Sequence, residues 1–248
     1  MTDPLHLIRA IEELSLNAWP ALQTSLYDGW ILRFANGYTR RANSISSLYP
    51  SSQPLEVKVA EVEKLYRDRH LQVVFKLTAA SHPEELDGFL ATHNYLAEGH
   101  TSVQLLDLND DLISSSCEIN PELTEEWFES FFRLSQLAPK HQSNARQLLQ
   151  RIIPRTGFAF LRDEGEIIAC GLGVVESSYI GLFDIVTETN RRRRGYGRQV
   201  VQGLLKWGKE QGAQQAYLQV TKKNDPALAL YSKLNFREQY QYWYRVKV

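Results

Sequence analysis

The sequence predicts an α/β protein made of two units in tandem. Short runs rich in β-branched and aromatic residues alternate with amphipathic runs of helical period along most of the chain. One order of elements occurs in both halves: a strand, a helix that opens near a proline, an asparagine before an aromatic residue, and a further strand. A chain of 248 residues is long enough for two ordinary domains, and we expect them at residues 1–112 and 113–248.

In the first half, the pattern places the strands and helices as follows. A hairpin turn is expected at Asn36-Gly37, because asparagine-glycine between alternating runs favours a two-residue turn. Ser81 and Glu84 have the spacing of a capping box that opens a helix. Strands are predicted at residues 39–48, 73–78 and 100–108, and helices at residues 55–69 and from 81 to about 93.

In the second half, the same reasoning predicts four helices and five strands. The helices are expected at residues 121–137 and 141–152, from the loop after residue 197 to about 212, and from residue 224 onward. The strands are expected at residues 157–162, 166–176, 179–187, 216–221 and 241–248. When Thr78 is aligned with Thr221, Pro83 falls on Pro226, and a two-residue gap then pairs Asn94-Tyr95 with Asn235-Phe236.

The composition is that of an ordinary globular protein, 43% hydrophobic and 23% charged. A net charge of −1 gives no global attraction to nucleic acid or to an anionic membrane, so neither is expected as a partner. Two cysteines are too few for a disulfide framework, and no histidine or cysteine spacing indicates a metal site. No apolar run has the length of a membrane span, and we expect a cytoplasmic protein.

The loop at residues 190–198, N-R-R-R-R-G-Y-G-R, lies between a predicted strand and a predicted helix. Amides of a first helical turn lack intrahelical acceptors, and the helix dipole adds positive potential, so this context predicts a diphosphate site. The nucleoside-triphosphate loop is excluded because no Lys-Ser or Lys-Thr follows Gly197. The dinucleotide pattern is excluded because Val200 stands at its third glycine.

Residues 192–197 fit [R/Q]-x-x-G-x-[G/A], which resembles the acetyl-CoA loop of the GNAT family of N-acetyltransferases. A second family segment, N-x-x-A-x-x-L-Y-x-x-x-G-F, is similar to residues 224–236, with Asn235 in place of its glycine. The matching positions are Asn224, Ala227, Leu230, Tyr231 and Phe236. The resemblance covers roughly residues 119–248 and implies GNAT-like units, each a mixed, mostly antiparallel sheet flanked by helices.

The resemblance implies an acetyl-CoA-dependent N-acetyltransferase in which a primary amine attacks the thioester directly. Main-chain groups of Ile185, Val186 and Thr187 are expected to hold the pantetheine arm like an added strand. The diphosphate is expected on the loop, at Arg193, Arg194, Gly195, Tyr196, Gly197 and Arg198. Tyr231 is the expected general acid for the departing thiolate, and Asn224 either bonds the cofactor arm or only caps its helix.

The sequence leaves several possibilities for the general base. Gln219 stands where some relatives carry a glutamate, and an amide cannot take a proton. Asp184 and Glu188 are candidates, directly or through water, although each also reads as a solvated carboxylate at a strand end. A substrate amine that arrives neutral would need neither. Cys170 is the candidate nucleophile for a covalent route, but it lies in an apolar run where a thiol is usually inert.

The first half lacks this chemistry. Its strand-to-helix connection is Y-P-S-S-Q-P, without a glycine turn, and Gly88 falls at the position of the motif tyrosine. We therefore expect a degenerate GNAT-like unit that serves as a scaffold or as a wall of the substrate cleft. The expected acceptor is a small-molecule amine or a protein amino group. Two alternatives stay open: a non-catalytic acyl-CoA-binding or regulatory module, and a nucleic-acid binder that uses the arginines at 191–194.

Overall fold

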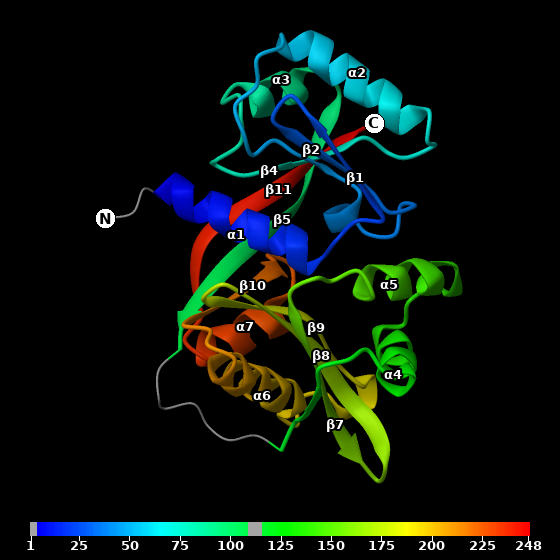
Figure 1. The fold of residues 1–248 in the computed structure, drawn as a ribbon, viewed down its shortest axis with the longest axis vertical. Coiled ribbons are helices and arrows are strands. Elements are labelled where there is room, and N and C mark those ends of the chain that lie inside the picture. Colours follow the sequence, from blue (N-terminus) through cyan, green and yellow to red (C-terminus); the bar gives the residue numbers. More distant parts are fainter. Residues whose placement is uncertain (1–3, 109–115) are drawn as a thin grey trace. The chain divides into compact units, whose positions relative to one another are not determined.

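The computed structural model describes residues 4–108 and 116–248, which form two compact units (Figure 1). Unit 1 comprises Met1–Ser102, Thr221–Lys223 and Tyr240–Val248, and unit 2 comprises Val103–Val220 and Asn224–Gln239. The last strand of the chain therefore groups mainly with the first half of the sequence. The expected boundary between residues 112 and 113 lies outside the described residues.

Unit 1 is a sheet with three helices. Its strands follow the order β1-β2-β3-β4-β11-β5. β3 and β4 pair in parallel, and the pairs β1-β2, β2-β3 and β4-β11 are antiparallel. The strands are β1 (Gln23–Tyr27), β2 (Trp30–Phe34), β3 (Ile45–Ser46), β4 (Val74–Leu77), β5 (Tyr95–Asp107) and β11 (Arg237–Lys247). The helices are α1 (Pro4–Ala18), α2 (Leu55–Arg67) and α3 (Leu86–Thr92), with a short 3-10 helix η1 (Arg40–Ala42).

The two faces of this sheet differ in chemistry. One face packs under α2 and α3, where Trp30 meets Phe75 edge to face with ring centroids 5.3 Å apart. The other face carries Lys76, which is 6% exposed and paired with Glu12 of α1 at 2.5 Å. Tyr240 donates a hydrogen bond of 2.8 Å to the same carboxylate. A buried carboxylate costs free energy unless it is paired. Lys76 and Tyr240 therefore make it possible for α1 to bury Glu12 against the sheet.

The predicted strand at residues 39–48 is mostly wrong. Only Ile45–Ser46 is strand, and η1 occupies residues 40–42. The reason is Asn43, whose Oδ1 accepts from the amides of Ala35 at 2.7 Å and Gly37 at 3.0 Å. These side-chain bonds hold the backbone as a loop and compete with a sheet ladder. The turn at Asn36-Gly37 is present, closed by the Tyr38 amide on the Ala35 carbonyl at 3.0 Å, but strands do not flank it directly.

The predicted capping box is also wrong. Ser81 Oγ accepts from the amide of Thr78 at 3.0 Å, and α3 begins later, at Leu86, with no side-chain cap. A tight hairpin that was not predicted joins β1 to β2 at Asp28-Gly29, where both residues have positive φ. Aspartate-glycine between strands is a known signal for this turn, so the sequence did contain the information.

Unit 2 has strand order β5-β10-β9-β8-β7-β6, antiparallel from β6 to β9 and parallel between β9 and β10. Its strands besides β5 are β6 (Glu118–Asn120), β7 (Arg155–Asp163), β8 (Glu166–Glu176), β9 (Tyr179–Thr187) and β10 (Gln215–Thr221). Its helices are α4 (Glu125–Ser135), α5 (Gln142–Leu149), α6 (Tyr196–Glu210) and α7 (Asp225–Lys233), with 3-10 turns η2 (Pro139–His141) and η3 (Thr189–Arg191). The expected mixed, mostly antiparallel architecture is confirmed.

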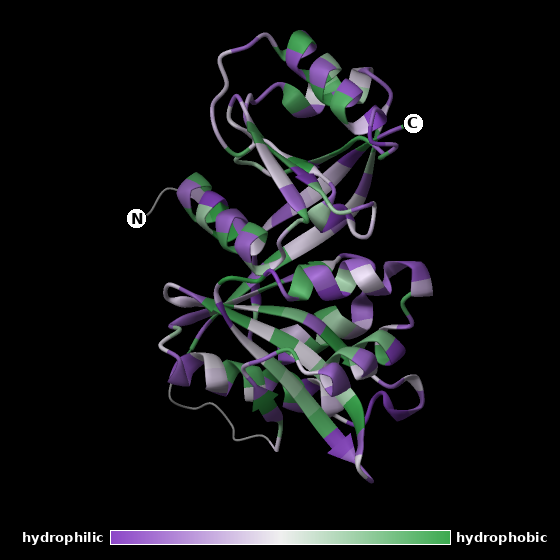
Figure 2. Ribbon diagram, turned by 45° about the vertical axis from the view of Figure 1, so that its right-hand side comes forward, coloured by the Kyte–Doolittle hydropathy of each residue, from purple (hydrophilic) through white to green (hydrophobic). Residues whose placement is uncertain are grey.

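Helices cover both faces of the sheet in unit 2. Apolar residues of α6 and α7 form one cluster with the strands, and Figure 2 shows long hydrophobic stretches along these strands. On the other face, Trp127 of α4 donates to the Ala159 carbonyl at 2.9 Å and meets Phe158 edge to face. Among the described residues, no helix is both long and apolar enough to cross a membrane.

Candidate functional site

The candidate site lies where β9 leaves the sheet of unit 2 and the chain turns into α6. The predicted strand at 179–187 is β9 itself, and the predicted helix is α6, which runs to Glu210. Between them, η3 and a glycine turn reverse the chain over eight residues. The sequence therefore located the strand, the loop and the helix of this site correctly.

A β-bulge distorts the end of β9. Cys170 of β8 pairs with Val186 and Leu172 pairs with Phe183, so Gly171 faces two residues, Asp184 and Ile185. Asp184 adopts a positive φ of 50°, which few residues other than glycine adopt without cost. Bulges re-aim main-chain groups and end regular pairing, and they are common beside active sites. The bulge was not predicted from the sequence, although a glycine inside the apolar β8 run is a signal for it.

Just before the bulge, the pairing of β9 with its parallel neighbour ends. The register with β10 runs from Tyr179 opposite Gln215 to Leu182 opposite Leu218, while β9 itself continues to Thr187. The ladder to β10 thus ends before the three residues whose main chain is expected to hold the cofactor arm, Ile185, Val186 and Thr187. Parallel strands that pair and then part leave main-chain donors and acceptors for an extended ligand between them.

The loop ends in a conformation that exposes the first turn of α6. Gly195 is the residue before the helix and has a φ of 86°, and a Cβ built there meets no atom within 4 Å. Gln199 makes the first helical bond, to the Gly195 carbonyl at 3.0 Å. The amides of Tyr196, Gly197 and Arg198 precede it and have no intrahelical acceptor, as in any helix N-terminus. Their partial charges and the helix dipole attract an anion.

Gly197 sits between this helix end, β9 and α7. A Cβ built there would lie 3.5 Å from Thr187 Oγ1 and 3.8 Å from Leu230 Cδ2, both ordinary contacts. The fold therefore has room for a Cβ at 197, and the protein's own packing does not explain the glycine. A ligand that approaches the backbone closely would explain it.

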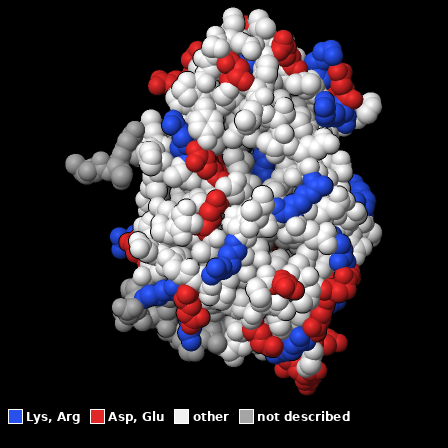
Figure 3. Space-filling model, viewed as in Figure 1, with Lys and Arg blue, Asp and Glu red and all other residues white. Residues whose placement is uncertain are grey.

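The arginines of the loop divide into two groups. Arg191 is paired with Asp163 and with Glu188, and Arg192 Nε donates to the Thr187 carbonyl at 3.3 Å. Arg193 and Arg194 are exposed. Two of the four arginines thus organise the loop, which counts against a nucleic-acid surface. Figure 3 shows acidic and basic side chains interspersed over the face in view, without a basic stripe.

The second motif forms α7 as predicted. Asn224 is the N-cap, and its Oδ1 accepts from the Ala227 amide at 3.3 Å. Tyr231 is 8% exposed and packs edge to face on Phe236, with centroids 5.8 Å apart. Burial raises the pKa of Tyr231 to about 12. Asn235, in place of the family glycine, has a φ of 66°, the left-handed conformation expected for it.

The candidate bases differ in their surroundings. Glu188 is held by two arginines: Oε1 lies 3.3 Å from Arg133 Nη1, and Oε2 lies 3.3 Å from Arg191 Nε. Asp184 is half-buried and lies in the bulge. Cys170 is fully buried, and burial raises the pKa of its thiol well above the ordinary value. A thiol that stays protonated is a poor nucleophile, which counts against a covalent route. Within residues 4–108 and 116–248, no group of three or more potential metal ligands occurs.

Comparisons with known proteins identify the family. The profile of a family described as "Probable histone acetyltransferase Rv0428c C-terminal" matches residues 6–245. The chain is 30% identical to "Uncharacterized N-acetyltransferase YobR" of Bacillus subtilis (strain 168) over 247 residues, which cover 97% of this chain and 98% of that protein.

Solved structures show the same fold. A GCN5-related N-acetyltransferase from Kribbella flavida has a TM-score of 0.68 at 13% identity and is matched over 96% of this chain and 95% of its own. A tandem GNAT protein from the clavulanic acid biosynthesis pathway, solved without AcCoA, has a TM-score of 0.63 at 12% identity, over 95% of this chain and 87% of its own. The chain therefore belongs to the Rv0428c C-terminal family and is an N-acetyltransferase of the GNAT superfamily.

Proposed function

We propose that unit 2 binds acetyl-CoA and transfers its acetyl group to a primary amine by direct attack. The observation that carries this proposal is the open N-terminus of α6, which follows a strand that has parted from its parallel neighbour. The diphosphate lies on the amides from Arg193 to Arg198, and the exposed side chains of Arg193 and Arg194 add positive charge. Unit 1 contributes no cofactor site of its own and acts as the degenerate partner in a tandem arrangement.

The pantetheine arm extends the sheet beside β9. Main-chain groups of Ile185, Val186 and Thr187 bond it as they would bond a strand, and one amide beside the bulge polarises the acetyl carbonyl. Polarisation by a fixed amide stabilises the oxyanion that forms when the amine attacks, without moving any group. Tyr231 then donates a hydrogen bond to the departing sulfur.

We assign the proton-accepting role to Asp184, directly or through water. An ammonium with a pKa of about 10.4 is almost fully charged at neutral pH, so loss of its proton limits the reaction. Asp184→Asn should lower kcat/KM about tenfold at pH 7, and the loss should shrink as the pH approaches 10 and the amine loses its proton unaided. Glu188→Gln, the matched control, should change kcat/KM less than about threefold, because its arginine pairs are structural. Equal losses in both variants would contradict this assignment.

The proposed activity is tested with purified protein, acetyl-CoA and a panel of primary amines that includes polyamines, amino acids and peptides with free amino groups. We expect thiol release that depends on the amine, with an acetylated product of matching mass. Interference from the protein's own thiols should be low, because Cys170 is buried and burial raises the pKa of Cys117 to about 12. Cofactor binding without product for any amine would favour the non-catalytic alternative.

Asn224 can serve both roles that the sequence left open. Its Oδ1 caps α7, and its Nδ2 protons are then available to the cofactor arm. Asn224→Ala should cost about 1 kcal/mol of unfolding free energy, and Asn224→Ser should restore most of that loss, because serine is also a good cap. Serine is too short to reach the cofactor, so the KM for acetyl-CoA should rise about 3- to 10-fold in both variants. A KM in Asn224→Ser equal to that of the wild type would leave Asn224 a cap only.

A further inference from the structure

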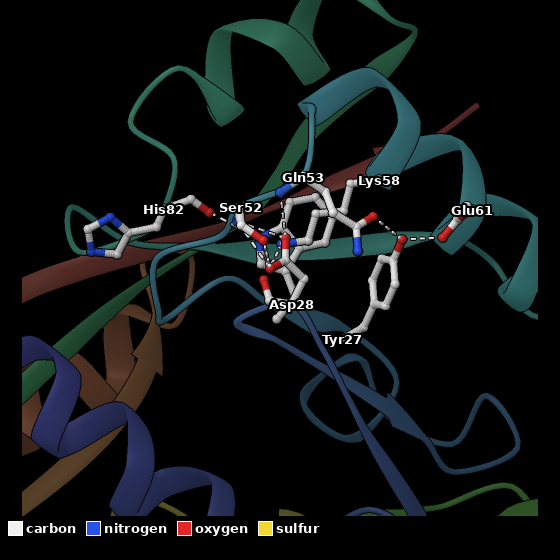
Figure 4. A network of polar contacts seen from close by, with 8 residues as sticks. Tyr27, Asp28, Ser52, Gln53, Lys58, Glu61 and His82 are labelled. Carbon is white, nitrogen blue, oxygen red and sulfur yellow. Dashed lines mark hydrogen bonds and ion pairs between the residues drawn. The ribbon is translucent and has the colours of Figure 1, made fainter.

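In unit 1 a carboxylate of the protein occupies the loop before α2. Asp28, in the β1–β2 hairpin, accepts from the Ser52 amide with both oxygens at 3.0 Å. It also accepts from the Gln53 amide at 3.0 Å and from Ser52 Oγ at 2.9 Å. Figure 4 shows these groups converging on the carboxylate from the loop that leads into the helix. Together they lower the pKa of Asp28 far below its ordinary value.

Two further features place Asp28 at this loop. Gly29, the next residue, lies so close to the loop that a Cβ built there would fall 2.2 Å from the Pro50 carbonyl oxygen. The hairpin can therefore reach the loop only with glycine at this position. Lys58, in the first turns of α2, has a side chain with no exposed surface, and its Nζ lies 3.3 Å from Asp28 Oδ2. Its ammonium also lies 4.1 Å from the centroid of the Trp30 ring.

This loop has the same topology as the loop of the candidate site. In unit 1, β3 leads through the loop into α2, and the next strand, β4, is parallel to β3. In unit 2, β9 leads through its loop into α6, and the next strand, β10, is parallel to β9. Ser52 and Gln53 stand three and two residues before the first residue of α2, as Arg193 and Arg194 stand before the first residue of α6.

We propose that Asp28 is a built-in anion that fills, in unit 1, the amide nest equivalent to the diphosphate nest of unit 2. The carboxylate takes the hydrogen bonds and the buried ammonium that a phosphate oxygen would take. Unit 1 is therefore closed to phosphate-bearing ligands by its own side chain, and removal of that carboxylate leaves a phosphate site. The proposal uses the proposed function only for the equivalence of the two loops.

The test compares thermal-unfolding midpoints in sodium pyrophosphate and in sodium chloride of equal ionic strength. The variants are Asp28→Ala and, as a matched control, Asp68→Ala. The control removes one aspartate charge at the other end of α2, where Asp68 pairs with the exposed Lys64 in the i,i+4 position. In chloride, Asp28→Ala should unfold about 5 °C below wild type, because Lys58 loses its carboxylate partner and keeps only the main-chain carbonyl of residue 28. In pyrophosphate the unfolding midpoint of Asp28→Ala should recover at least half of that loss. This recovery is counted after subtracting any rise that pyrophosphate causes in wild type and in Asp68→Ala.

Each outcome separates this proposal from the proposed function. The pyrophosphate increment in wild type reports the unit 2 loop, and the additional increment in Asp28→Ala reports unit 1. If pyrophosphate raises the unfolding midpoint of Asp28→Ala no more than that of wild type, the inference is overturned, even if wild type itself responds. If pyrophosphate raises the midpoint of Asp28→Ala but not that of wild type, the inference is supported, and the result counts against the unit 2 diphosphate site.

A double variant, Asp28→Ala with Lys58→Met, leaves no unpaired buried charge and remains readable if Asp28→Ala does not fold. Lys58→Met alone serves as its reference. The double variant retains the nest amides but lacks the ammonium. Pyrophosphate should therefore raise its unfolding midpoint more than that of Lys58→Met, but by a smaller difference than that between Asp28→Ala and wild type. If pyrophosphate raises the unfolding midpoint of the double variant by no more than that of Lys58→Met, the inference is overturned.

Discussion

Replacement of Gly197 by leucine should weaken coenzyme A binding about 100-fold or more and leave the fold intact. The fold has room for a Cβ at this position, since the nearest atoms to it are Thr187 Oγ1 at 3.5 Å and Leu230 Cδ2 at 3.8 Å. In the proposed binding mode, a leucine side chain would occupy space that the cofactor needs in order to approach the first turn of α6. Loss of two hydrogen bonds to a charged group costs about 3 kcal/mol or more, which corresponds to at least about 100-fold in Kd.

The measurement is the Kd for coenzyme A by calorimetry, with the urea-unfolding free energy of each variant beside it. Gly88→Leu is the matched control, because Gly88 is a helical glycine in unit 1 whose Cβ meets nothing within 4 Å. Both variants should unfold within about 1 kcal/mol of wild type. An unchanged Kd in Gly197→Leu would contradict the placement of the diphosphate at α6.

Gly195 provides an independent comparison at the same helix. Gly195 precedes α6 with a φ of 86°, and Gly212 follows its other end with a φ of 96°; a Cβ would meet nothing at either position. Alanine in the left-handed region costs about 1–2 kcal/mol, so both alanine variants should lose similar stability. Only Gly195→Ala should also weaken coenzyme A binding.

The strand, loop and helix of the candidate site were predictable because their signals are local. The β-branched run of β9, the glycine turn and the apolar period of α6 each occupy one continuous segment, and the structure has them at the predicted residues. The cap at Asn224 and the left-handed Asn235 are likewise decided by residues within a few positions of each other.

What the sequence could not show depends on pairing between distant segments. Trp243 of β11 pairs with Leu77 of β4, so the last strand joins unit 1, and no local pattern distinguishes that neighbour from another. Asp28 meets Ser52 across 24 positions, and Glu12 meets Lys76 across 64. Each pair looks like two ordinary surface charges or hydroxyls until the hairpin and the helix bring the partners together.

Tyr231→Phe should lower kcat about 100-fold with little change in the KM for acetyl-CoA. Burial raises the pKa of Tyr231 to about 12, so the hydroxyl stays protonated across the working range. A thiol has a pKa of about 8.5, so full proton transfer from this phenol would be uphill. In the proposed mechanism the hydroxyl therefore acts chiefly by hydrogen bonding to the developing thiolate. A hydrogen bond to a charged group contributes about 1.5–3 kcal/mol, or roughly 10- to 150-fold in rate. Phenylalanine keeps the ring contact with Phe236, so the fold should not change.

The matched control is Tyr179→Phe, at the opposite end of β9, which should leave kcat unchanged. A pH series then separates catalysis from stability. The folded-state pKa of Tyr231 lies above the unfolded value of about 10. The neutral side chain therefore contributes stability that is fully present below pH 10 and is lost as the pH rises toward 12. Tyr231→Phe should therefore lose less stability than wild type between pH 10 and 11, while its kcat deficit should persist at every pH below 10. A kcat equal to that of wild type, with the alkaline difference still present, would leave Tyr231 a core residue and require another donor for the departing sulfur.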